Sequence, residues 1–464
     1  MRDLRHVRPV GDRASAGACA FTVIPSVVLL LFRGALRPWW GIVLVALATV
    51  GIGVLLHLQR RRILQPRHVF VACALAIGVA VVVPPRTSED LWIYTAYGRT
   101  VSAHDANPYE RPPSAYPDDV FHDRVGESWR GTRAMYGPVF VGVSAAVTAV
   151  AQDSALAVRL GFQFVAAAAV GAVLVLLWRR TRDPSVVALV GLHPAVVVSI
   201  VNGAHVDALV GLAVVVAVVA AIDNRLALTT VALAGAVLVK VPAALALIGV
   251  VPWVWRRYGP ARAIAIASGA AVPSVLLYRG VGGFDTLRRG AELGIVSRSS
   301  PWQFVRFSFA PWWPYSPIDI EWERVTTLGT RAVLIVAVIA ALRWSGRRTP
   351  RAAVGAATLS IAVFGAYFLP WYTFVPLAVV ALRPRDLLTA FVVVHAAVLT
   401  AVYEFDPDAL DVGPHPRALP IVVNLVLPAL AAVVFVAVLV RRSKGPPIDV
   451  RDQRVERLTV GTAV

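Results

Sequence analysis

The sequence predicts an all-α protein that crosses a membrane many times, and three observations support this fold class. The 464 residues are 58% hydrophobic with a mean hydropathy of +0.69, which is more apolar than a soluble domain of this size. Apolar runs of about 17–25 residues recur between residues 21 and 440, and each is long enough to cross roughly 30 Å of hydrocarbon. Arginines gather between these runs, as in the cytoplasmic loops of membrane proteins. We therefore expect a polytopic bundle of about 12 to 14 transmembrane helices.

The net charge of +18 is explained by membrane topology rather than by nucleic-acid binding. The arginine clusters occupy residues 60–67, 179–182, 256–262, 343–351 and 441–442. A nucleic-acid-binding protein would instead combine basic and aromatic side chains on one soluble face. Placing these clusters in the cytoplasm places both termini there as well. The first span is expected to remain as an anchor, because no clear cleavage site follows the basic start.

The candidate spans can be placed along the whole chain. They cover residues 18–33, 38–58, 68–84, 137–178, 185–201, 206–222, 226–240, 241–255, 262–278, 326–342, 352–369, 371–384, 386–403 and 417–440. The expected parts are a cytoplasmic N-terminus (1–17), a transmembrane domain (18–440) and a cytoplasmic tail (441–464). Within the domain, the expected outer loops are 85–136, 279–325 and 403–417.

Two stretches do not fit one helix per span. Residues 137–178 are long enough for two crossings, but the arginines on either side require one, so we expect a re-entrant or interfacial segment after Gly137-Pro138. The short apolar runs on either side of Lys240 are expected to form a hairpin that turns at Val241-Pro242.

The first outer loop carries the strongest candidate for a catalytic group. Glu89 and Asp90 directly follow an apolar span, which places two carboxylates at the membrane–water boundary. The loop also supplies aromatic rings and hydrogen-bonding groups that suit a sugar, namely Tyr94, Arg99, His104, Tyr109 and Tyr136. The alternative is a solvated loop whose aromatic side chains anchor it at the interface. The acidic pair alone leaves both interpretations open.

A second polar group interrupts the apolar sequence at 202–207, which the charge pattern also places on the outer side. Ionisable residues at membrane depth are costly and are usually functional or paired. His205 and Asp207 are therefore candidates for substrate binding, although they could equally satisfy each other. No metal site is predicted, because no third ligand stands at a suitable spacing, and Cys19 and Cys73 show no ligand pattern.

Lys240 is the third candidate. The chain contains only two lysines, Lys240 and Lys444, among its 45 basic residues. Lys240 stands in otherwise unbroken apolar sequence, where a buried ammonium needs an anionic partner such as a lipid phosphate or a carboxylate. We favour a phosphate contact. The alternative is a side chain that extends from the end of a span to the interface.

Two later segments add candidates for substrate binding. Arg298, in the second outer loop, runs against the positive-inside bias, so it could bind an anion or contact the membrane surface. Trp371 and Tyr372 interrupt two apolar runs with an aromatic turn. Such a turn anchors helices at the interface or stacks on a sugar or prenyl chain.

Taken in order, these motifs resemble those of a known family. They are Glu89-Asp90, Asn107-Pro108-Tyr109, Tyr136-Gly137-Pro138, Gly203-Ala204-His205-Val206-Asp207, the lysine–proline step at Lys240 and Pro370-Trp371-Tyr372. The chain is similar to the actinobacterial polyprenyl-phosphate-mannose-dependent alpha-mannosyltransferases of the GT-C superfamily, which include lipomannan-building alpha-1,6-mannosyltransferases. His193-Pro194-Ala195 and His205-Val206-Asp207 depart from the Asn-Pro-Leu and His-Asn-Asp typical of that family. The sugar, the acceptor and the linkage therefore stay open.

The resemblance implies a GT-C-like helical bundle in the cell membrane, with a structured first outer loop and an active site on the outer face. It implies transfer of a sugar, mannose in the family, from a polyprenyl-phosphate carrier to a hydroxyl of a glycolipid or glycan acceptor. The displacement inverts configuration and uses no cofactor, no nucleotide sugar and usually no metal.

The resemblance also implies roles for particular residues. Asp90 would be the general base that deprotonates the acceptor hydroxyl, with Glu89 as the fallback for the same role. Lys240 and Arg298 would stabilise the leaving phosphate. His205 and Asp207 would position the sugar or the phosphate.

Other classes of membrane protein share some of these features. A lipid-linked sugar flippase or transporter is the main alternative, but it would more often show two related halves and ion-coupling acids at mid-membrane. A polymerase or ligase that uses the same carrier would rely more on arginine and histidine clusters in large outer loops. A non-catalytic scaffold would leave the cost of Lys240 unexplained.

Overall fold

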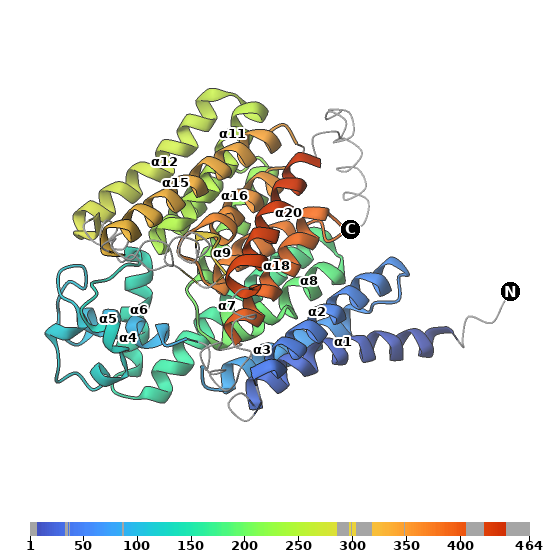
Figure 1. Ribbon diagram of the computed structural model, residues 1–464, viewed down its shortest axis with the longest axis horizontal. Coiled ribbons are helices and arrows are strands. Elements are labelled where there is room, and N and C mark those ends of the chain that lie inside the picture. The colour runs from blue at the N-terminus through green and yellow to red at the C-terminus, as the bar shows by residue number, and fades with distance from the viewer. Residues whose placement is uncertain are drawn as a thin grey trace.

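The protein is built from helices. The computed structural model describes residues 7–32, 36, 38–85, 88–284, 297, 299–302, 318–347, 349–404 and 422–441. These residues form helices joined by turns and irregular segments, with no β-strand among them, so the predicted all-α fold class is confirmed. Figure 1 shows a body of packed helices and, at its lower left, a less regular region that contains α4 (Asp90–Ser102), α5 (Glu127–Arg130) and α6 (Pro138–Ala151).

Six of the described helices contain a stretch that is long and apolar enough to cross a membrane. They are α1 (Val7–Phe32), α2 (Pro38–Arg60), α7 (Ala155–Thr181), α12 (Pro260–Gly280), α15 (Ile318–Trp344) and α18 (Leu387–Glu404). The pair α8 (Pro184–Gly191) and η3 (Ala195–Asn202) is bent by 57° and adds a seventh if it forms one span. The protein is therefore a multi-pass membrane protein.

Shorter apolar helices complete the described bundle. They are α3 (Pro66–Val82), α6, α9 (Asp207–Ile222), α10 (Leu226–Val239), α16 (Arg351–Phe364), η5 (Pro370–Thr373) with α17 (Phe374–Val380), and α20 (Leu427–Arg441). The 14 residues of α10 give a helix about 21 Å long, which is too short to cross about 30 Å of hydrocarbon. The expected total of about 12 to 14 spans would need most of these helices to cross as well, so that total stays a prediction.

Helix α9 lies at the centre of the described core, and most of its residues are buried. It packs against α7, α10 and α17. Gly211 allows α17 to approach closely, because a Cβ at this position would lie 2.4 Å from the Phe374 ring. Small residues permit such close helix packing in membranes, where the hydrophobic effect does not drive helices together.

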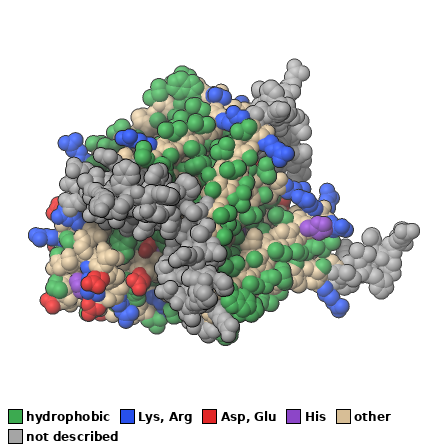
Figure 2. Space-filling view, in the orientation of Figure 1, with side chains coloured by type: hydrophobic (Ala, Val, Ile, Leu, Met, Phe, Trp, Pro, Cys, Tyr) green, Lys and Arg blue, Asp and Glu red, His purple; other side chains and the backbone are tan. Residues whose placement is uncertain are grey.

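The face shown in Figure 2 has an apolar part and a polar part. Hydrophobic side chains cover much of the helical body in Figure 2, whereas the acidic side chains visible in this view gather at the lower left, over the region of α4 and α5. Apolar residues of α12 such as Leu276 and Val272 are more than half exposed, as expected for a lipid-facing helix. The polar region corresponds to the predicted first outer loop, and its described residues form helices, turns and irregular segments.

Several boundaries differ from those predicted. Helix α1 begins at Val7, within the segment expected to precede the first span. Range 137–178 divides into α6 and α7 at a turn of residues 152–154, so a short helix precedes a full-length one. Helix α10 ends before Lys240, and the next α-helix, α11 (Ala244–Tyr258), begins after it.

The side of the membrane on which each segment lies stays a prediction, as do the cytoplasmic N-terminus and tail. Several predicted basic clusters occupy last turns of helices, including Arg60 of α2, Arg179 of α7 and Arg256 of α11. Most of the predicted outer loops 279–325 and 403–417 lies outside the described residues, and so does Arg298.

Candidate active site

Asp90 begins helix α4 and faces the interior of the bundle. Its N–H donates to Ser88 Oγ at 3.0 Å, which pairs one of the N–H groups that have no partner within the helix. Its Oδ2 accepts a 3.4 Å hydrogen bond from the hydroxyl of Tyr94, one turn further along the helix, and lies 3.5 Å from Nδ1 of His205. The side chain keeps 26% of its surface exposed, so a small molecule can still reach it.

The environment of Asp90 favours its protonated form relative to an ordinary aspartate. Burial raises the pKa of its carboxyl, and the nearby Asp207 carboxylate raises it further. The hydrogen bond with Ser88 and the positive charge of Lys240 act in the opposite direction without cancelling the increase. A raised carboxyl pKa suits a general base, because a base works best when its pKa lies near the operating pH.

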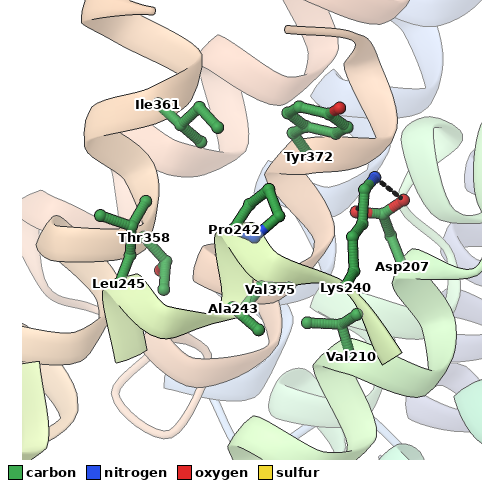
Figure 3. Close-up of a pocket in the computed structure, with 10 residues that line it drawn as sticks. All are labelled: Asp207, Val210, Lys240, Pro242, Ala243, Leu245, Thr358, Ile361, Tyr372 and Val375. Atoms are coloured by element: carbon green, nitrogen blue, oxygen red, sulfur yellow. Dashed lines mark hydrogen bonds and ion pairs between the residues drawn. The ribbon is translucent and has the colours of Figure 1, made fainter. Parts of the chain in front are cut away.

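Lys240 forms a buried ion pair with Asp207. Its Nζ donates to both carboxylate oxygens, at 3.1 Å and 2.9 Å, and lies 3.9 Å from the centre of the Tyr372 ring. Figure 3 shows these three side chains around a space of about 30 Å³, which suffices for a water molecule but not for a sugar. Of the two anionic partners that the sequence left open, the described structure supplies the carboxylate, and the phosphate contact stays a prediction.

His205 lies between Asp90 and the aromatic turn of η5. The ring is fully buried and stacks on Trp371 with 3.5 Å between centroids. Ala204 precedes it with a φ of +56°, an uncommon conformation for a residue other than glycine, and this turn directs the imidazole into the site. Neither ring nitrogen makes a hydrogen bond with the described residues, although buried polar groups are usually paired.

The Tyr136-Gly137 step supports Lys240 from the side of α6. The N–H of Gly137 donates to Val239 O at 2.9 Å, and a Cβ on Gly137 would lie 1.9 Å from Leu238 O. Only glycine fits there without moving the segment that carries Lys240. The Tyr136 ring meets the Tyr94 ring edge to face at 5.0 Å, which also joins this step to α4.

Two amides tie the His205 segment to the chain that leads into Asp90. Asn202 Nδ2 donates to Ala80 O at 3.1 Å and to Val83 O at 2.8 Å, and Gln163 Nε2 donates to the same two oxygens. Both side chains are fully buried. The sequence-based prediction missed Gln163, although an isolated amide in the apolar run of α7 was a usable signal.

The arrangement therefore brings together a carboxylate, an imidazole and an ion pair from segments far apart in the sequence.

Comparison with known proteins identifies the family of the chain. Residues 16–257, more than half of the chain, match the family model of the alpha-(1->6)-mannopyranosyltransferase N-terminal domain. The chain belongs to this family. It is also similar to alpha-(1->6)-mannopyranosyltransferase A of Mycobacterium tuberculosis, with 25% identity over 374 residues that cover 74% of this chain and 70% of that protein.

The mannosyltransferase family match contains most of the site. Asp90, His205, Asp207 and Lys240 all lie within residues 16–257, whereas the aromatic turn of η5 lies beyond them. The protein is thus a membrane glycosyltransferase of the mannosyltransferase class, as the sequence motifs indicated.

Other predicted substrate-binding residues lie away from this centre and are engaged within the outer loop. Arg99 is buried and donates to Asp119 at 2.7 Å and to Asp153 at 2.9 Å. His104 shares the Asp119 carboxylate at 2.8 Å. Burial opposes ionisation of Asp119, but the hydrogen bonds from Arg99, the Phe121 N–H and His104 outweigh it and lower its pKa. These bonds fasten the loop to α4, and contact of Arg99 or His104 with substrate stays a prediction.

Tyr109 and Glu89 also have definite places. The Tyr109 hydroxyl donates to Tyr136 O at 2.7 Å, so Tyr109 supports the glycine step rather than facing Asp90. Glu89 directly precedes α4 and is exposed. Within the described residues, no group of three or more histidine, cysteine or acidic side chains is placed to hold a metal ion.

Proposed function

We propose that this mannosyltransferase transfers mannose from a polyprenyl-phosphate carrier to a hydroxyl of a glycolipid or glycan at the outer membrane face, in one inverting displacement. An α-(1→6) linkage belongs to the proposal, because the family and the M. tuberculosis relative carry that linkage in their names. The observation that supports it best is the position of Asp90, a partly exposed carboxylate of raised pKa beside a buried imidazole and a buried ion pair.

In the proposed reaction, Asp90 removes the proton of the acceptor hydroxyl while that oxygen forms a bond to the anomeric carbon of the donor. The bond between this carbon and the phosphate oxygen breaks, and its electron pair leaves with polyprenyl phosphate. Attack opposite the leaving group inverts the configuration of the anomeric carbon. A positioned general base of this kind contributes about 10²- to 10⁴-fold to the rate.

Lys240 is suited to the leaving phosphate. An ammonium group has three N–H donors, and two of them serve the oxygens of Asp207. A phosphate arriving beside Tyr372 would share the same cation, which offsets the charge that develops on the leaving oxygen. Arg298 is retained as a second phosphate ligand in the proposal, and it lies outside the described residues.

His205 is proposed to position Asp90. With its proton on Nδ1, the ring can donate to Asp90 Oδ2. The two atoms are 3.5 Å apart, so a small movement of either side chain would bring them within hydrogen-bond distance. Catalytic hydrogen bonds often shorten when substrate binds. The stack on Trp371 restricts ring rotation, so the imidazole is held ready for this contact.

The outer face is proposed from the charge pattern. Arginines at the ends of α2, α7 and α11 support a cytoplasmic position for those ends, because positive charge is enriched in cytoplasmic loops. Asp90 follows α3 by a short segment and belongs to the acidic outer loop. Polyprenyl phosphate also suits a site beside the membrane, because its apolar chain can remain in the lipid while its phosphate reaches the polar residues.

The test supplies membranes with radiolabelled polyprenyl-phosphate-mannose and a glycolipid acceptor, and compares wild type with Asp90→Asn and Glu89→Gln at equal protein level. We expect Asp90→Asn to lose at least about 100-fold of the transfer rate, the lower limit for a general base. Glu89→Gln is the matched control and should retain transfer at saturating acceptor. Full activity of Asp90→Asn would refute the role of Asp90, and loss only in Glu89→Gln would move that role to Glu89. Transfer by detergent-solubilised protein would also separate a transferase from a flippase, which needs two compartments.

A further inference from the structure

A larger cavity lies next to the site and is not used by the chemistry described so far. It encloses about 390 Å³, within the usual size range of small-molecule sites. Its lining comes from three segments, which are the end of the chain after α3, the start of α4, and the start of α7, with Arg124 from the outer loop.

The cavity meets the chain on both sides of Asp90. Ser88, Glu89 and Leu91 line it, so a bound molecule lies against the residues that flank the proposed base. Asp90 Oδ2 lies 3.5 Å from His205 Nδ1 and its side chain is still 26% exposed, while Glu89, the residue before it, lines the cavity.

The polar groups of the cavity suit a neutral, hydroxyl-rich ligand better than a bare phosphate. Glu89 accepts hydrogen bonds, whereas Arg124 and Arg159 donate them, and sugar hydroxyls can do both. Arg159 uses only Nη1 in its bonds to Val82 O and the Gln163 amide, which leaves the rest of its guanidinium without a hydrogen bond among the described residues. A phosphate would be attracted by the arginines but repelled by Glu89.

The rim of the cavity continues onto apolar surface. Leu156, which lines it, is 59% exposed, and Val82, whose carbonyl binds Arg159, is 70% exposed. Both residues belong to apolar helices, Leu156 to α7 and Val82 to α3, and their side chains lie on the surface of the bundle. A ligand with a sugar head and an apolar tail would place its head in the cavity and its tail along these side chains.

We propose that this cavity is the subsite for the terminal sugar of a lipid-linked acceptor, and that Glu89 binds its hydroxyls instead of acting as a second base. The proposal rests on the proposed function for the identity of the acceptor. It assigns different tasks to two adjacent acids, with Asp90 taking the proton and Glu89 holding the sugar from which that proton comes.

Filling the cavity tests the proposal without touching the proposed catalytic residues. Leu156→Trp places a large ring in the cavity, and Val175→Trp is the matched control, because Val175 lies on the same helix, is 46% exposed and does not line the cavity. Glu89→Gln keeps the shape of the side chain and removes its charge. The probe is octyl α-D-mannopyranoside, used both as acceptor with polyprenyl-phosphate-mannose and as radiolabelled ligand in equilibrium dialysis without donor.

We expect Leu156→Trp and Glu89→Gln each to raise the acceptor KM about tenfold. Glu89→Gln replaces hydrogen bonds to a charged group by weaker bonds to a neutral amide, and Leu156→Trp takes up space that the sugar would occupy. Their kcat and donor KM should stay within about twofold of wild type, since only ground-state acceptor binding is removed. Val175→Trp should change none of these values. Equal acceptor KM in Leu156→Trp and wild type would overturn the proposal, as would a loss of kcat in Glu89→Gln at saturating acceptor.

Dialysis separates this proposal from the proposed function. If wild type binds the probe and Leu156→Trp binds it about tenfold more weakly, the subsite is supported even if no mannose is transferred. If mannose is transferred normally but the two proteins bind the probe equally, the subsite is refuted and the transferase function stands.

Discussion

Asp207→Asn should destabilise the protein, because it leaves the Lys240 ammonium buried without its counter-charge. The two side chains are 5% and 10% exposed, and Nζ is within 3.1 Å of both carboxylate oxygens. Removing one partner of a buried ion pair costs about 3–5 kcal/mol. At about 2.1 cal/mol/K per residue, the entropy of unfolding of the 464 residues is about 1 kcal/mol/K. Dividing the free-energy loss by this entropy gives a fall in Tm of about 3 to 5 °C.

Lys240→Met should lower Tm by a similar amount, because it leaves the Asp207 carboxylate buried alone. The double variant Asp207→Asn/Lys240→Met should recover most of the loss, since neither charge then remains. Thermal unfolding of the detergent-solubilised protein, followed by tryptophan fluorescence, measures all four species. The coupling between the two substitutions gives the strength of the pair directly.

A second buried pair provides the control. Arg351 Nη2 lies 2.6 Å from Asp386 Oδ2, and both side chains are at most 5% exposed. Asp386→Asn should lower Tm about as much as Asp207→Asn does but leave the donor KM unchanged at temperatures where the protein is folded. Wild-type Tm values for both Asp207→Asn and Lys240→Met, or a double variant as unstable as the sum of the two, would refute this reasoning.

Two further predictions concern Gly137 and Asp90. Gly137→Ala should lower stability by about 1–3 kcal/mol and slow transfer, because its Cβ would overlap Leu238 O. Gly142→Ala, inside α6, has open space, so it should keep the wild-type rate and unfold at or slightly above the wild-type temperature. The raised pKa of Asp90 places the acid limb of kcat/KM above pH 3.8, the ordinary aspartate value, and a limb at or below that pH would contradict it. Because the folded state raises this pKa, protonated Asp90 favours folding at low pH, and that contribution to stability is lost as the pH rises through the folded-state pKa. At pH 8 the variant Asp90→Asn should therefore unfold at or above the wild-type temperature, and the difference should shrink towards acid pH.

Hydropathy and charge placement were sufficient to predict the fold class, and they singled out residues that the described structure brings together in the candidate site. Asp90, His205, Lys240 and Trp371 come from four separate segments, yet each was recognisable as a polar or aromatic interruption of apolar sequence. Such interruptions are expensive inside a membrane unless they meet one another or a substrate. Their meeting in the structure follows from that cost.

The partners of these residues could not be predicted in the same way. A lipid phosphate and a carboxylate were both possible partners for the Lys240 ammonium group. Only the packing of α9 against α10 shows that the Asp207 carboxylate is within reach. Arg99 and His104 are predicted to bind substrate from their place in a polar loop, and the sequence did not show that the fold also brings Asp119 to both. Sequence distance carries no information about such contacts, because turns of irregular loops determine them.

The number of spans was also beyond hydropathy alone. A window of apolar residues does not reveal that a helix stops after 14 residues, as α10 does. The breaks coincide with functional candidates, since α9 starts at Asp207 and α10 ends before Lys240. The break between α10 and α11 is buried at Lys240, and irregular backbone in membrane proteins is tolerated where it is buried in protein or lines a cavity.

The places of Asp207 and Lys240 also bear on how the chain enters the membrane. Helices α9 and α10 are neighbours joined by residues 223–225, and they pack closely against each other. Asp207 opens the first helix and Lys240 follows the second, so the two charges stand together at the open end of one helical hairpin. If the hairpin inserts as a unit during synthesis, each charge can neutralise the other before any later helix exists. The pair would then lower the barrier to integration first and serve the finished enzyme afterwards.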